Sequence, residues 1–83
     1  MITVYTGPNC THCTTTKRAL ERAGLPFEEF PISDADRAEF RERGFRSLPV
    51  VMVSNEAGEL IDEWCGLRPD KINQLKVSQL KDA

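Results

Sequence analysis

The chain has 83 residues, a length that can build only one hydrophobic core, so we expect a single domain over residues 1–83. Hydrophobic residues make up 40% of the chain and charged residues 29%, which is the balance of a folded globular protein and excludes the disordered and fibrous classes. Eleven basic and thirteen acidic residues give a formal net charge of −2, so we expect no nucleic acid partner and no attraction to anionic lipid.

The first half of the chain carries signals for two strands that alternate with two helices. Pro8 interrupts a β-rich start, and Gly24 closes the mixed polar and apolar stretch that follows. Ser33 and Asp36, three residues apart, resemble a capping box at the start of a second helix, for which Gly44 is the expected end. These signals predict strands over residues 2–6 and 27–32, and helices over residues 10–23 and 33–44.

The second half of the chain predicts a hairpin followed by a last helix. Strand-like stretches over residues 48–53 and 59–64 flank a turn over residues 54–58, and Pro69 suits the first turn of a helix. Strands joined through a helix pair in parallel, whereas a hairpin is antiparallel. The sequence therefore predicts an α/β fold of order β-α-β-α-β-β-α, in which a mixed four-stranded sheet has helices on both faces.

Cys10 and Cys13 are separated by two residues at the start of the first predicted helix. A dithiol catalyst needs one accessible thiol that forms a thiolate near neutral pH, and a second thiol that can displace it from a mixed disulfide. Free N–H groups and the helix dipole would stabilise the thiolate of Cys10. We predict that Cys10 attacks a target disulfide and that Cys13 resolves the intermediate. His12 is a candidate modulator, because an imidazolium would favour the nearby thiolate, and an inert, exposed histidine is the alternative.

A metal site is the main alternative use of these residues. A C-x-x-C pair is also half of many zinc centres, and His12 and Cys65 could join Cys10 and Cys13 around one ion. The adjacent residues His12 and Cys13 would then have to reach the same ion, and a second C-x-x-C is missing. We therefore expect no metal and no cofactor. A non-enzymatic metal-binding or adaptor module, or an iron–sulfur cluster shared by two monomers, remains open.

The sequence also indicates a compartment. Residues 1–5 include no basic segment that leads into a long apolar stretch, and no run reaches the roughly 18 apolar residues of a membrane span. Three cysteines are an odd number and too few for a secreted disulfide framework, so the C-x-x-C pair is typical of a reactive site in a reducing compartment. We expect a cytoplasmic monomer with no membrane partner.

Four further segments of the chain are informative. They are Val4-Tyr5-Thr6, Thr16-Lys17-Arg18-Ala19, Gly44-Phe45-Arg46-Ser47-Leu48-Pro49-Val50-Val51 and Trp64-Cys65-Gly66-Leu67-Arg68-Pro69-Asp70. Together they resemble one known family, the NrdH-redoxins, which are glutaredoxin-like proteins that pass electrons from thioredoxin reductase to the class Ib ribonucleotide reductase. The resemblance spans nearly the whole chain and implies a thioredoxin-like fold and a thiol–disulfide oxidoreductase. Cys65 stands where the family usually has Ser, Leu67 where it has Phe, and Thr11-His12 where Val-Gln is common.

The resemblance also implies roles for four residues near the active cysteines. Pro49 matches a cis-proline beside the active site, and the backbone of Leu48 would pair with an extended substrate segment that lies across Cys10. A proline that merely opens an edge strand is the alternative. Trp64 and Arg68 match residues that hold the loop before the last helix through polar contacts. We expect this structural role for both, with contact to a partner as the second interpretation.

The resemblance also indicates which of two reductants, glutathione or thioredoxin reductase, supplies electrons to the protein. Similar glutaredoxins bind a glutathione carboxylate through a Gly-Gly-x-x-Asp-Asp stretch whose free N–H groups lie at the start of the last helix. Here Pro69 lacks an N–H at that place, and Asn9 stands where many glutaredoxins have Lys or Arg. We expect thioredoxin reductase as the reductant and the large subunit of ribonucleotide reductase as the target. A glutathione-dependent glutaredoxin is the alternative.

Other polar residues near the motif receive no catalytic role. Lys17 and Arg18 are expected on a solvated face of the first helix, and Cys65 as an inert small residue. Thioredoxins bury an acid six residues before the first cysteine, where this chain has Val4. Proton transfer from Cys13 would therefore use water, the substrate or a hydroxyl such as that of Thr6.

Overall fold

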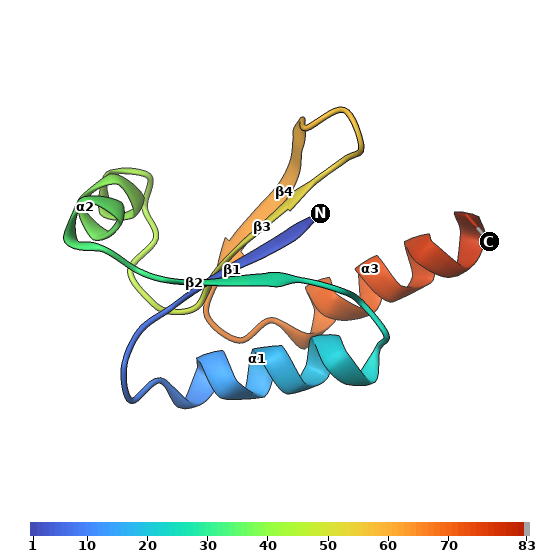
Figure 1. Ribbon diagram of the computed structural model, residues 1–83, viewed down its shortest axis with the longest axis horizontal. Coiled ribbons are helices and arrows are strands. Elements are labelled where there is room, and N and C mark those ends of the chain that lie inside the picture. Colours follow the sequence, from blue (N-terminus) through green and yellow to red (C-terminus); the bar gives the residue numbers. More distant parts are fainter. Residues whose placement is uncertain (83) are drawn as a thin grey trace.

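The computed structural model describes the backbone of residues 1–82 and the side chains of residues 1–76. Its elements follow the predicted order β-α-β-α-β-β-α (Figure 1). The predicted boundaries lie within two residues of the observed ones, which is the usual uncertainty at the ends of elements. The strands are β1 (Ile2–Thr6), β2 (Glu28–Pro31), β3 (Val50–Ser54) and β4 (Leu60–Cys65), and the helices are α1 (Thr11–Arg22), α2 (Asp34–Glu42) and α3 (Pro69–Asp82).

The four strands form one mixed sheet in the order β2-β1-β3-β4. Strand β1 pairs in parallel with β2, whereas the pairs β1–β3 and β3–β4 are antiparallel. The register between β3 and β4 shifts near the hairpin, where Val53 pairs with Asp62 but Ser54 pairs with Leu60. Ile61 is the extra residue of this bulge. The predicted mixed four-stranded sheet is confirmed, and β2 and β4 are its two edges.

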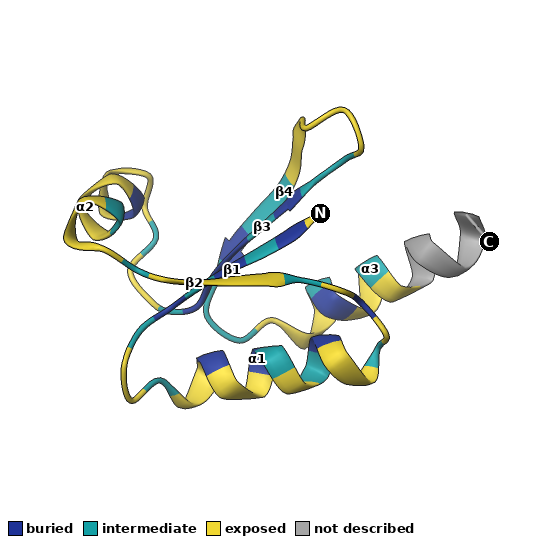
Figure 2. Ribbon diagram, in the orientation of Figure 1, coloured by how far each residue is buried: buried dark blue, intermediate teal, exposed yellow. Residues whose placement is uncertain are grey.

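One face of the sheet is covered by α1 and α3 and carries the main core (Figure 1). Residues alternate between the two faces of a strand, so every second residue of β1 and β3 is buried here. Figure 2 shows the buried positions of α1 and α3 on the sides of these helices that approach the sheet. The buried core residues are Ile2, Val4, Leu20, Leu25, Val51, Val53, Trp64 and Ile72.

The opposite face carries α2 alone (Figure 1), so helices lie on both faces as predicted. Phe40 is the buried residue of α2. Its ring meets the edge of Tyr5 from β1 at a centroid distance of 5.1 Å, and Phe45 lies 6.2 Å away. Such edge-to-face contacts are favourable for aromatic rings. A small aromatic cluster therefore attaches α2 to the sheet.

The helix ends follow the signals in the sequence. The Ser33 side chain accepts a hydrogen bond from the Asp36 N–H at 3.1 Å, and the Asp36 carboxylate accepts one from the Ser33 N–H at 3.2 Å. This is the predicted capping box. Gly24 and Gly44 follow α1 and α2 with φ of 70° and 90°, values that favour glycine after a helix. Within the described residues, no helix has the length and apolarity needed to cross a bilayer.

Candidate active site

Cys10 is the N-cap of α1, at the end of the loop that follows β1. Its backbone is extended, with φ −102° and ψ 100°, and its Sγ accepts a hydrogen bond from the Cys13 N–H at 3.1 Å. A sulfur in this position faces the positive end of the helix dipole and an N–H group that has no partner within the helix. A thiolate on Cys10 would therefore be stabilised there.

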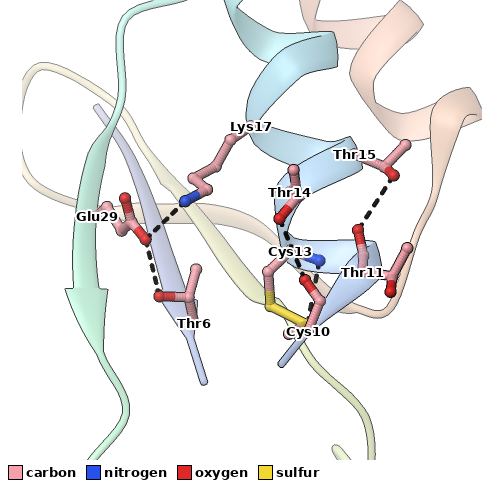
Figure 3. Close-up of a disulfide and its surroundings, with 8 residues drawn as sticks. All are labelled: Thr6, Cys10, Thr11, Cys13, Thr14, Thr15, Lys17 and Glu29. Atoms are coloured by element: carbon pink, nitrogen blue, oxygen red, sulfur yellow. Dashed lines mark hydrogen bonds and ion pairs between the residues drawn. A yellow bond between two sulfur atoms is a disulfide. The ribbon is translucent and has the colours of Figure 1, made fainter. Parts of the chain in front are cut away.

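Cys10 and Cys13 are joined by a disulfide, with their Cα atoms 5.2 Å apart (Figure 3). The two residues differ in exposure, since Cys10 is half-buried and Cys13 is only 3% exposed. An incoming molecule can reach Cys10 from solvent, whereas Cys13 is covered by the protein. The arrangement gives one accessible and one shielded sulfur, as the predicted attacking and resolving roles require.

A polar cluster connects α1 to the edge strand β2 close to this disulfide (Figure 3). The buried Thr6 hydroxyl donates to Glu29 Oε2 at 2.9 Å, and Lys17 Nζ lies 3.0 Å from the same oxygen. The hydrogen bond from Lys17, followed by the one from Thr6, lowers the pKa of Glu29 below its usual value. Lys17 is therefore paired, although the sequence suggested only a solvated position, and Glu29 was not singled out from the sequence.

A cavity of about 540 Å³ opens beside Cys10, between α2 and the loops that contain the active cysteine and Pro49. It brings together Cys10, His12 and Leu48. Pro49 is buried next to it, and the Leu48–Pro49 peptide bond is cis, as the resemblance implied. Three lining residues, Arg37, Arg41 and Arg46, were not singled out from the sequence. The four-residue spacing of Arg37 and Arg41 on one predicted helix was the signal that they share a face.

Trp64 and Arg68 lie outside this cavity. Trp64 is a core residue with 3% exposure, and its buried indole Nε1 has no hydrogen-bond partner among the described residues. Trp64 therefore contributes packing in place of the expected polar contact, because the core surrounds its ring. Arg68 is exposed and binds the Asp70 carboxylate through Nε at 3.1 Å and Nη2 at 2.9 Å. This contact raises the pKa of Arg68 and lowers that of Asp70.

The start of α3 offers few free donors for an anion. The Gly66 N–H donates to the Pro49 carbonyl at 2.9 Å, and Pro69 has no N–H. The Lys71 N–H donates to the Arg68 carbonyl, while the Asp70 carboxylate already occupies the positive end of the helix. A carboxylate from outside would compete with Asp70 at this place.

Cys65 is a free, half-buried thiol at the end of β4. Burial opposes its ionisation, but the Ser47 hydroxyl and the backbone N–H groups of Arg46 and Ser47 outweigh that effect and lower the pKa of Cys65 below its usual value. Cys65 does not line the cavity beside Cys10. In the part of the chain that the structure describes, no three His, Cys, Asp or Glu side chains are grouped to hold a metal ion.

The chain is similar to known proteins in its sequence and in its structure. The glutaredoxin family model matches residues 2–57. The glutaredoxin-like protein NrdH of Salmonella typhimurium is 49% identical over 76 residues, which cover 89% of this chain and 86% of that protein. The structure of NrdH-redoxin from Escherichia coli, described as having a thioredoxin-like activity profile, superposes with a TM-score of 0.72 at 42% identity, covering 89% of this chain and 92% of that chain. The glutaredoxin structure from Archaeoglobus fulgidus gives 0.62 at 26% identity, covering 89% and 83%.

Proposed function

Because the chain belongs to the glutaredoxin family, among its NrdH-type members, we propose that it donates electrons to the large subunit of a class Ib ribonucleotide reductase and is itself reduced by thioredoxin reductase. The chain is a thiol–disulfide oxidoreductase with a thioredoxin-like fold. The two partners are those of the NrdH-redoxins that its sequence resembles. The difference in exposure between Cys10 and Cys13 supports a dithiol cycle at this site.

The proposed cycle moves two electrons to the target. The Cys10 thiolate attacks one sulfur of the target disulfide, and the other target sulfur leaves as a thiolate that takes up a proton. Cys13 then loses its proton and attacks Cys10 Sγ, which releases the second target thiol and forms the Cys10–Cys13 disulfide. Thioredoxin reductase returns two electrons and two protons. His12, at the rim of the cavity, modulates Cys10, and the backbone of Leu48 pairs with the target segment.

The start of α3 supports the choice of reductant. A glutathione carboxylate needs free N–H groups, and here Gly66 donates to Pro49, Pro69 has no N–H and Asp70 occupies the helix start. Glutathione then keeps only part of the binding energy that glutaredoxins with a glycine-rich stretch provide. The role of Arg68 is to hold Asp70 at this position.

The electron source is tested by coupled oxidation of NADPH with each reducing system in turn. We expect efficient turnover with thioredoxin reductase, and turnover with glutathione and glutathione reductase that is roughly tenfold slower or more, since charge-assisted contacts to glutathione are missing. Efficient turnover with glutathione and none with thioredoxin reductase would identify a glutathione-dependent glutaredoxin instead.

The roles of the two cysteines are tested by replacing each with serine. Cys10→Ser should abolish reduction of the ribonucleotide reductase subunit, because the Cys13 thiol that remains at the site is covered by the protein and cannot attack the target. Cys13→Ser should still attack and accumulate as a mixed disulfide, which intact-mass measurement detects. Equal trapping by both variants would contradict the assignment.

A further inference from the structure

The cavity beside Cys10 has a strong excess of positive charge. Arg37 and Arg41 line it from α2, and Arg46 lines it from the loop that leads to Leu48. None of the residues that line the cavity is Asp or Glu. The chain as a whole carries a net charge of −2. The local charge at the active site is therefore opposite in sign to that of the whole molecule.

These three guanidinium groups are not neutralised by the ion pairs of the structure. The ion pairs between described side chains involve other bases, namely Lys17, Arg43, Arg68 and Lys71. The acidic residues of α2 do not line the cavity, and one of them, Asp36, is held in the capping box. The arginines therefore remain free to bind an anion.

Arg37 reaches the loop that contains the active cysteine. A Cβ atom built on Gly7 would lie 3.4 Å from Arg37 Nη2 and 2.7 Å from Leu48 Cδ1. The absence of a side chain at Gly7 therefore lets the guanidinium and Leu48 approach the start of this loop. Helix α2 and the start of α1 lie toward the same end of the sheet (Figure 1). A target that is attacked at Cys10 passes within reach of this charge.

The rest of the cavity wall is apolar. Ile32, Phe40, Phe45, Leu48 and Val50 line it beside the arginines. A volume of about 540 Å³ lies within the range of roughly 300–1,000 Å³ that is common for ligand sites in proteins. Several side chains of an extended segment can enter a space of this size. Charge at the rim and apolar contact inside suit a peptide better than a small inorganic anion.

We propose that this cavity selects targets whose reducible disulfide lies in an extended segment rich in Asp and Glu. Their carboxylates bind Arg37, Arg41 and Arg46, because a guanidinium forms paired, charge-assisted hydrogen bonds with a carboxylate. The positive rim also attracts such a segment before contact. This inference rests on the proposed function, since it names the chemistry of the partner at the same site.

The test uses three synthetic peptides with the same disulfide, flanked on both sides by Glu, Gln or Lys. The reduced full-length protein is mixed with each peptide in a single turnover, in which the peptide disulfide becomes two thiols and the protein dithiol becomes the Cys10–Cys13 disulfide. At low salt we expect the Glu peptide to react roughly tenfold faster than the Gln peptide, and the Lys peptide to react slowest. Because salt screens charge, this preference should shrink at high ionic strength.

Two triple variants with the same change of net charge distinguish the effect of charge in the cavity from the effect of charge elsewhere on the surface. The triple variant R37Q/R41Q/R46Q should lose most of the preference for the Glu peptide. The control variant R18Q/R22Q/K76Q changes exposed bases that do not line the cavity and should keep it. Circular dichroism verifies that both variants are folded. The salt dependence of the preference for the Glu peptide is measured on the unmodified protein and therefore does not depend on how any variant folds.

Each contrary outcome has a separate meaning. If the unmodified protein reduces all three peptides at the same rate, or if the control variant loses the preference equally, the inference is wrong while the proposed function stands. If oxidised glutathione reacts as fast as the Glu peptide and depends on the same arginines, the cavity selects a small anionic disulfide, which also overturns the inference. If no peptide is reduced, the proposed function itself fails.

Discussion

The two faces of the sheet are built in different ways although they share the same strands. Val4, Leu20 and Val51 are completely buried on the face that α1 and α3 cover. On the other face, α2 contributes the single buried residue Phe40 and leaves a cavity at its side. The closed face provides stability, and the open face leaves room for another molecule. The disulfide lies at the boundary, because Cys13 is a buried residue of α1 while Cys10 lines the cavity.

The largest expected effect is on the free energy of unfolding, when one leucine on each face is replaced by alanine so that the same atoms are removed. Leu20→Ala should lower the free energy of unfolding by roughly 3 kcal/mol, because Leu20 is fully buried and a cavity would remain. Leu48→Ala should cost roughly 1 kcal/mol or less, because Leu48 is half-buried at an open cavity, and it should slow peptide reduction instead. Urea denaturation and single-turnover rates measure both quantities. A similar loss of stability in the two variants would remove the distinction between the faces.

A smaller effect is expected at the edge of the closed face, where Glu29 joins α1 to β2. The pKa of Glu29 is lowered below its usual value in the folded protein, so its contribution to stability is present above the pKa of the unfolded chain and is lost as the pH falls through the lowered value. Because the pair is exposed, Glu29→Gln should cost less than about 1 kcal/mol at pH 7 and nothing below the lowered pKa. Chemical denaturation over a pH series measures the difference.

Glu28→Gln is the matched control for this experiment. Glu28 is an exposed residue of the same strand, and no ion pair among the described residues includes it. It should show no such dependence on pH. An equal, pH-dependent loss in both variants would mean that the general charge of β2, and not the contact with Lys17, is responsible.

The smallest effect is expected for Cys65→Ser on the open face. Cys65 lies outside the cavity, and serine has nearly the same size and keeps a polar atom beside Ser47. Turnover should stay within about twofold of the unmodified protein, as for most changes away from a site. A large loss of turnover, or a disulfide from Cys65 to Cys10 or Cys13 in peptide mapping, would show that the open face has a third redox residue.

The sequence was sufficient for the order of the elements and for the pairing of Cys10 with Cys13. The capping box at Ser33 and the glycines after α1 and α2 depend on neighbouring residues, so they can be recognised without knowing the fold. The same holds for Cys10 and Cys13, whose short spacing at a helix start defines their geometry. Local signals of this kind were confirmed by the structure.

Contacts between distant segments could not be predicted in the same way. Thr6, Lys17 and Glu29 belong to three different elements, and their contact requires the parallel register of β1 and β2. The arginines of the cavity likewise need α2 to be placed opposite the loop around Cys10. A tryptophan can either pack in a core or make a polar contact through its indole N–H, so the residue type of Trp64 does not predict its role. Trp64 packs because β4 places its side chain in the hydrophobic core.

The two edges of the sheet also affect whether separate molecules of the protein associate with one another. An open edge has free N–H and C=O groups that can pair with a second molecule and begin aggregation. Strand β2 counters this with only four residues, two of them glutamates, and with Pro31 at its end. Strand β4 presents the exposed residues Leu60 and Ile61, but its bulge falls at the same place and disturbs a regular edge. Because both edges are short, charged or irregular, we expect the protein to resist aggregation through its sheet edges at high concentration.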